Sequence, residues 1–188
     1  MKRESCLEIL HQLRQDGGIV VTTMSAVAPW SRLSHTVYDF PSAGSAMAHA
    51  ADFAMGIALA QPKRPVWAIN GDGSMLMSLG TLVTVCQTPP ANFILFVLQN
   101  DTFEVTGNQP IPGAGKIDMV LLAKGSGFTK AYQFADIRTL TRELPTVLCE
   151  TGPTFVNLII EPGEEPPPKL DGSIRVPAHE MRAALCKP

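Results

Sequence analysis

The chain has 188 residues, of which 45% are hydrophobic and 17% charged, and its formal net charge is −2. This balance is typical of one globular domain with a sizeable core, and it lacks the basic excess that nucleic-acid binding requires. No apolar stretch has the length needed to span a bilayer, and residues 1–18 lack the apolar core of an export signal. We therefore expect a cytoplasmic protein that binds neither nucleic acid nor membrane.

The cysteines are scattered along the chain and form no CxxC pair; they are Cys6, Cys86, Cys149 and Cys186. Their spacing argues against a zinc knuckle or an iron–sulfur cluster. We expect free thiols in a reducing compartment.

Apolar spacing and Gly/Pro punctuation predict alternating helices and strands in the first half of the chain. We expect a helix over 5–15, a buried strand over 19–23, and then a loop that contains Pro29 and Pro41. An Ala-rich helix, packed closely on both sides, is expected over 45–61. A strand over 65–69, a helix over 74–87 and a strand over 93–99 follow, and the last is apolar throughout, as in strands covered on both faces.

The second half begins with a long polar loop over 100–116, and loops of this length are usually functional or mobile. A helix, a strand, a helix and a strand are then predicted over 117–127, 128–134, 136–144 and 154–161. The alternation predicts an α/β domain of the doubly wound type, with a mainly parallel sheet and helices on both faces. We assign residues 1–163 to this domain and residues 164–188 to a proline-rich linker and a C-terminal helical tail.

Two of the expected strand ends carry unusual polar residues. The segment Asn70-Gly71-Asp72-Gly73-Ser74 follows one strand, and Gln99-Asn100-Asp101-Thr102 follows the next. A right-handed crossover could set these ends side by side, where carboxylate, amide and carbonyl oxygens would suit Mg²⁺ together with phosphate oxygens. Gly73 and Ser74 open the next helix, whose free N–H groups favour an anion. The pattern indicates a diphosphate site, although a lone GDG is more often an ordinary turn.

GDGS at 71–74, with Asn100 placed 28 residues after Asp72, resembles the fingerprint of thiamin diphosphate-dependent enzymes. The resemblance extends over roughly residues 15–163 and includes "DMVLLAKGSGF", "GPTFVNLIIEPG" and "TGNQP". Within the family, the sequence is similar to the beta subunits of sulfopyruvate decarboxylase and to the corresponding part of phosphonopyruvate decarboxylase.

The resemblance implies a role for several residues. Mg²⁺ would be held by the side chains of Asp72 and Asn100 and by the carbonyl of Thr102. Met47 would wedge between the two cofactor rings and fix their V shape, and the Ser45 carbonyl would accept the aminopyrimidine N–H. The other expected cofactor contacts, with Thr23 the weaker candidate, are Thr23, Gly71, Gly73, Ser74 and Phe103.

The sequence departs from the family pattern at four positions. Glycine usually stands where this chain has Ser45 and Ala48, and asparagine where it has Gln99. Glu104 replaces a small residue, and a carboxylate that points into the cofactor mouth would disfavour anionic substrates. This change puts a sulfonate or phosphonate substrate in doubt.

The family's activating glutamate lies on a separate pyrimidine-binding domain, and this chain matches only the diphosphate-binding half. The resemblance therefore implies a beta subunit of a two-chain 2-oxo acid decarboxylase, with the glutamate supplied by an alpha subunit in a dimer of heterodimers or a larger hetero-oligomer. A two-chain carboligase resembling acetolactate synthase and a non-catalytic cofactor-binding subunit are the alternatives.

Outside the fingerprint, Asn108 and Gln109 are candidate substrate contacts in the 100–116 loop, although simple loop solvation is equally compatible with their polarity. His35 and His49 could shuttle protons near pH 7, but neither has an evident carboxylate partner nearby in the sequence.

Overall fold

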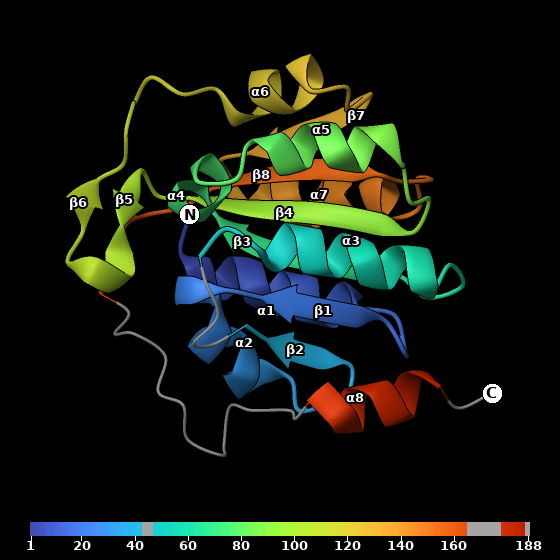
Figure 1. Cartoon of the computed structure of the whole chain (residues 1–188). Coiled ribbons are helices and arrows are strands. Elements are labelled where there is room, and N and C mark those ends of the chain that lie inside the picture. Colours follow the sequence, from blue (N-terminus) through green and yellow to red (C-terminus); the bar gives the residue numbers. More distant parts are fainter. Residues whose placement is uncertain (43–46, 165–177, 187–188) are drawn as a thin grey trace.

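The computed structural model describes residues 1–42, 47–164 and 178–186. Six parallel strands form one sheet in the order β2-β1-β3-β4-β8-β7 (Figure 1). In chain order the strands of this sheet are β1 (Ile19–Thr22), β2 (Asp39–Pro41), β3 (Val66–Gly71), β4 (Phe93–Gln99), β7 (Lys130–Phe134) and β8 (Thr154–Ile159). The sheet confirms the predicted doubly wound α/β fold.

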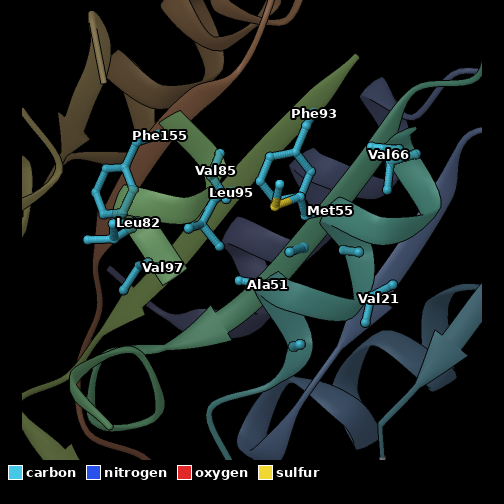
Figure 2. Packing of buried hydrophobic residues seen from close by; sticks show 14 of the residues in the cluster. Val21, Ala51, Met55, Val66, Leu82, Val85, Phe93, Leu95, Val97 and Phe155 are labelled. Carbon is cyan, nitrogen blue, oxygen red and sulfur yellow. The ribbon is translucent and has the colours of Figure 1, made fainter. Parts of the chain in front are cut away.

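Helices cover both faces of this sheet, and the strand residues alternate between them. One face packs against α1 (Arg3–Leu13), α2 (Val27–Leu33) and α7 (Ile137–Leu148). The other packs against α3 (Ala50–Ala60), α5 (Gly80–Gln87), α6 (Met119–Gly125) and α8 (Ala178–Leu185). Figure 2 shows this second core, where Leu95 and Val97 of β4 meet side chains of the covering helices. Because both faces are covered, β4 is buried along its whole length, as its apolar sequence predicts.

The region that contains Pro29 and Pro41 is more regular than the predicted loop. Pro29 is the third residue of α2, where the backbone N–H has no helical partner, so proline does not break the helix. Pro41 ends β2, which lies at the edge of the sheet, where a missing N–H donor does little harm.

The two central helices also differ from the prediction. The Ala-rich helix begins at Ala50 rather than at residue 45, and its outer side is open in the described structure, with Phe53 44% and Leu59 45% exposed. The helix expected over 74–87 is split into α4 (Asp72–Leu76) and α5, which are separated by Met77–Leu79. Helix α7 continues through Pro145 to Leu148, because Leu140, Leu144 and Val147 keep its apolar side in the core.

The remaining differences lie near the carboxyl ends of the strands and at the C-terminus. The expected loop over 100–116 contains a small antiparallel hairpin of β5 (Thr102–Phe103) and β6 (Gln109–Pro110), with the 3-10 turn η2 (Glu104–Thr106) between them. The C-terminal helix exists as predicted, and α8 packs on the domain through the buried Met181. Most of the predicted linker lies outside the described residues. None of the described helices is long and apolar enough to cross a membrane.

A close approach between two backbone segments makes Gly152 a sensitive position. A Cβ atom there would lie 2.5 Å from the Phe93 carbonyl oxygen and 3.1 Å from the Ala91 carbonyl oxygen. Because these are backbone atoms at the start of β4 and just before it, Gly152→Ala is expected to lower the free energy of unfolding by about 1–3 kcal/mol in urea denaturation. The control is Gly56→Ala in α3, where no atom lies within 4 Å of the added methyl group. This change should stabilise by about 0.5–1 kcal/mol, and equal effects of both changes would contradict the prediction.

Candidate functional site

A pocket opens at the carboxyl ends of β1, β3 and β4. The chain leaves β1 toward β2 on one side, while β3 lies on the other, so this is the kind of switch point at which open α/β sheets bind ligands. Four segments line the pocket: Met24 and Ser25 after β1, Met47 before α3, residues 71–74 at the end of β3, and Leu98, Asn100 and residues 102–106 at the end of β4 and in the loop beyond it. The predicted juxtaposition of the two polar strand ends is therefore confirmed.

Asp72 forms the closest link between these two strand ends. Its Oδ2 atom accepts the backbone N–H groups of Asn100 at 3.0 Å and Asp101 at 2.7 Å, and its Oδ1 accepts that of Gly73 at 2.7 Å. The residue is only 2% exposed. Burial raises the pKa of the Asp72 carboxyl to about 6, although the three N–H groups act against this rise. A cation beside the carboxylate would offset the cost of burying its charge.

Asn100 and Thr102 present further oxygen atoms at the same place. The Oδ1 atom of Asn100 accepts the Thr102 backbone N–H at 3.0 Å, and this carbonyl-type oxygen has a second lone pair. The Nδ2 atom of Asn100 donates to Glu104 Oε2 at 2.7 Å. The strand register pairs Gly71 with Leu98, so Asp72 lies one residue and Asn100 two residues beyond this pair.

Two serine hydroxyl groups tie the turn before α3 to the GDGS segment and to the residues between α4 and α5. Ser74 Oγ accepts the Ala48 backbone N–H at 2.8 Å, and Ser78 Oγ donates to the Ala48 carbonyl at 2.8 Å. Ala48 has a φ of 89°, in the left-handed region that favours glycine. This conformation gives a physical reason for the glycine that the family usually has at this position. The neighbouring Met47 lines the pocket.

Gly73 lies directly against an aromatic ring. A Cβ atom at this position would lie 2.6 Å from Cε1 and 2.8 Å from Cδ1 of Phe103. The hairpin that carries Phe103 therefore rests on the backbone of the GDG segment. The helix that begins here is α4, which has five residues, so its dipole contributes less toward an anion than the long helix predicted from the sequence.

Glu104 lines the pocket but has a buried positive partner. Its carboxylate pairs with the guanidinium group of Arg3 in α1, and both residues are 6% exposed. The Gly163 backbone N–H also donates to Oε2, at 3.3 Å. The positive charge of Arg3 balances this carboxylate, so the objection that Glu104 would repel an anionic substrate loses much of its force.

The other predicted site residues have mixed positions. Thr23 follows β1 and is buried, and its Oγ1 has no hydrogen-bond partner within the described part of the chain. Ser45 lies outside the described residues. Asn108 uses both ends of its amide inside the protein, accepting from Thr102 Oγ1 and donating to the Gly163 carbonyl at 2.8 Å each. Gln109 is exposed and accepts from Thr106 Oγ1 at 3.1 Å. Neither of the last two lines the pocket.

Several features of the site were missed by the sequence analysis. Met24 and Ser25 line the pocket because they follow β1, whose end lies on the same edge of the sheet. The rule that ligands bind beyond strand ends would have included them, had it been applied to β1 as well. His49 does have a carboxylate partner, Asp52, whose Oδ2 lies 2.9 Å from Nδ1 on the exposed side of α3.

Comparison with protein families identifies residues 16–158 as a match to the model described as "Thiamine pyrophosphate enzyme, C-terminal TPP binding domain". The match spans the six-stranded sheet up to β8 and includes every described segment that lines the pocket. It also agrees with the resemblance that the GDGS segment and Asn100 indicate.

Individual proteins give the same result. The phosphonopyruvate decarboxylase of Streptomyces viridochromogenes is 35% identical over 87% of this chain and 39% of its own length. The sulfopyruvate decarboxylase subunit beta of Methanothermobacter thermautotrophicus is 35% identical over 66% of this chain and 64% of its own length. This chain thus spans about two fifths of the first relative and about two thirds of the second.

A solved structure supports the fold independently. The thiamine diphosphate-dependent 4-hydroxybenzoylformate decarboxylase of Rhodococcus jostii superimposes with a TM-score of 0.72 over 87% of this chain and 33% of its own, at 23% sequence identity. With the family match, the relatives and this fold in agreement, the chain belongs to the thiamine pyrophosphate enzyme family, of which it carries the C-terminal TPP-binding domain.

Proposed function

We propose that this chain is the diphosphate-binding beta subunit of a two-chain, thiamin diphosphate-dependent 2-oxo acid decarboxylase. The observation that carries the proposal is the meeting of Asp72 and Asn100 in one pocket at the ends of β3 and β4. The names of the relatives, which are decarboxylases of phosphonopyruvate and sulfopyruvate, support the reaction class.

The oxygen atoms at this point suit Mg²⁺. Asp72 supplies a carboxylate, Asn100 an amide oxygen and Thr102 a backbone carbonyl, which are the hard ligands that this ion prefers. No three His, Cys, Asp or Glu side chains converge as a metal cluster in the described ranges, so amide, carbonyl and phosphate oxygens would complete the coordination. Mg²⁺ commonly binds in this way, through one or two carboxylates and the phosphates of a ligand.

The surroundings of these oxygens suit the diphosphate. The absence of a side chain at Gly71, where no atom lies within 4 Å of the Cβ position, allows close approach to the backbone, and Gly73 and the hydroxyl-bearing Ser74 line the same pocket. Thr23 Oγ1, which has no hydrogen-bond partner among the described residues, gives a second hydroxyl near the end of the neighbouring strand β1. We propose that Phe103 contributes its backbone N–H.

The remaining cofactor contacts follow from the turn that precedes α3. Met47 lines the pocket, and the two serine hydrogen bonds to Ala48 hold the backbone beside it. We propose that Met47 keeps the two cofactor rings in a V and that the Ser45 carbonyl accepts the aminopyrimidine N–H. Thiamin diphosphate, when bound, supplies the electron sink that allows the carboxylate of a 2-oxo acid to leave as CO₂.

We propose that the activating acid comes from another chain. Within the described residues, two carboxylates line the pocket and both are already engaged, because Asp72 accepts three backbone N–H groups and Glu104 pairs with Arg3. The relative whose name designates it a beta subunit has a similar extent, and the longer phosphonopyruvate decarboxylases have room for a second domain. Exposed apolar side chains that follow the GDGS segment in the chain also fit a subunit contact, since Met77 after α4 is 62% and Val83 of α5 56% exposed.

The substrate class is a small 2-oxo acid. The pairing of Glu104 with Arg3 is compatible with an anionic group such as a sulfonate or a phosphonate at the far end of the substrate. Asn108 and Gln109 remain candidate substrate contacts, although Asn108 would first have to release its bonds to Thr102 and Gly163.

Asp72→Asn tests the metal site. At a hundredfold excess over Kd, thiamin diphosphate with Mg²⁺ should stabilise the wild-type chain by about 2.7 kcal/mol. The variant should lose this increment, because an amide replaces the anionic ligand, and thermal unfolding with and without both ligands measures the change. Asp118→Asn removes an exposed carboxylate that caps α6 and should keep the full shift. A full shift in the Asp72 variant would exclude Asp72 as a metal ligand.

Gly73→Ala tests the close contact under the hairpin. The added methyl group would displace the Phe103 ring from its position on the GDG segment. We expect the affinity for thiamin diphosphate with Mg²⁺ to fall about tenfold in calorimetry, corresponding to about 1.4 kcal/mol. Gly80→Ala, where no atom lies within 4 Å, is the matched control and should leave the affinity unchanged. An unaltered affinity in the Gly73 variant would show that the ring can move freely.

The two-chain assembly is tested by reconstitution. The purified chain with thiamin diphosphate, Mg²⁺ and sulfopyruvate, phosphonopyruvate or pyruvate should release little CO₂. Addition of a chain that carries a pyrimidine-binding domain with its glutamate should raise turnover by at least a hundredfold. Robust turnover by the chain alone would overturn the two-chain proposal. The product separates the alternatives, since an aldehyde indicates decarboxylation and a longer hydroxyketone indicates carboligation.

A further inference from the structure

The amide of Asn100 has two ends of similar shape, but only its oxygen can bind a metal ion. We propose that Glu104 is a positioning residue, which fixes the orientation of this amide so that Oδ1 is the end offered to the metal. The inference rests on the proposed function, in which Asn100 is a ligand of Mg²⁺. It assigns to Glu104 a task that is separate from contact with substrate or cofactor.

Two hydrogen bonds define the orientation of the amide. Asn100 Nδ2 donates to Glu104 Oε2 at 2.7 Å, and Asn100 Oδ1 accepts the Thr102 backbone N–H at 3.0 Å. Rotation of the amide by 180° would place its oxygen against the carboxylate and its NH₂ group against the Thr102 N–H. Both hydrogen bonds would then become repulsive contacts, inside a region where Asn100 is 8% exposed and water cannot readily replace them.

The Glu104 carboxylate is itself fixed by segments far apart in the chain. Arg3 in α1 pairs with Oε1, and the Gly163 N–H beyond β8 donates to Oε2 at 3.3 Å. Because Arg3 engages the other oxygen, Oε2 is the atom that faces Asn100. A carboxylate also has no N–H donor, so it can accept from Nδ2 but can never satisfy an inverted amide. Carboxylates that orient a metal ligand in this way typically contribute tenfold to a hundredfold to metal affinity.

A purely structural role for the Arg3–Glu104 pair would have a different signature. In that case, removal of Glu104 would weaken metal binding through a general loosening of the fold, whichever residue occupies position 100. If Glu104 acts through the amide, its importance must disappear when the ligand has oxygen at both ends. Asn100→Asp creates this condition, because a carboxylate offers oxygen to the metal in either orientation.

The experiment is therefore a double-mutant cycle on metal affinity with the full chain. Mn²⁺ is titrated in the presence of thiamin diphosphate, and the free ion is followed by its EPR signal. Glu104→Gln should weaken Mn²⁺ binding at least tenfold in the wild-type background, because the Gln oxygen is drawn to Arg3 and its NH₂ group then faces Asn100. In the Asn100→Asp background the same change should cause no loss, because an NH₂ group can donate to the new carboxylate.

The control is Glu4→Gln. Glu4 also accepts from Arg3, at 3.0 Å from Nη2, but it makes no hydrogen bond to Asn100, so Mn²⁺ affinity should stay unchanged. If Arg3 without its partner prevents folding of the Glu104 variant, the apolar pair Arg3→Met, Glu104→Leu removes both charges. This double change should weaken Mn²⁺ binding when position 100 is asparagine and cause no loss when it is aspartate.

The outcomes separate the inference from the function on which it rests. Equal losses in both backgrounds, or no loss in either, would overturn the positioning role while leaving the metal site intact. Absence of Mn²⁺ binding by the wild-type chain, both alone and with a pyrimidine-binding partner, would overturn the proposed function and this inference with it.

Discussion

The carboxylate of Asp72 connects the end of β3 to the loop after β4, and the site depends on this connection. Two parallel strands lie side by side, so one step beyond Gly71 and two steps beyond Leu98 meet at a single point. The carboxylate accepts N–H groups from both segments while it is almost entirely buried. An arrangement of this kind holds a charge in place at an energetic cost, and a bound cation would remove most of that cost.

Contacts between distant parts of the chain support the pocket. Arg3 of α1 and Gly163 beyond β8 both bond to Glu104 in the loop after β4, while Ser74 and Ser78 fix the turn that carries Met47. The pocket is thus supported by contacts that are distant in sequence, and each of them depends on the order of strands in the sheet. This dependence explains how a site made mainly of loops can be well defined.

Sequence reasoning succeeded where the signal was local. The apolar run of β4, the alternation of elements and the spacing of Asp72 and Asn100 predicted the fold and the meeting of the strand ends. It failed where long-range contacts decide the outcome: the Arg3 partner of Glu104 is 101 residues away in the chain and has no local signature. The break between α4 and α5 and the continuation of α7 through Pro145 likewise depend on packing that propensity does not encode. Roles of single residues toward a cofactor remain predictions.

The ring of Phe103 over Gly73 has a consequence for the interpretation of short fingerprints. A glycine in such a motif is usually credited to the small molecule that it accommodates. Here the space beside the glycine is filled by the protein's own phenyl group, so the packing of the hairpin by itself requires glycine at this position. A relative that no longer catalyses the reaction could therefore keep this glycine because its hairpin still packs there. An aspartate at the position of Asp72 would be the better indication that the reaction survives.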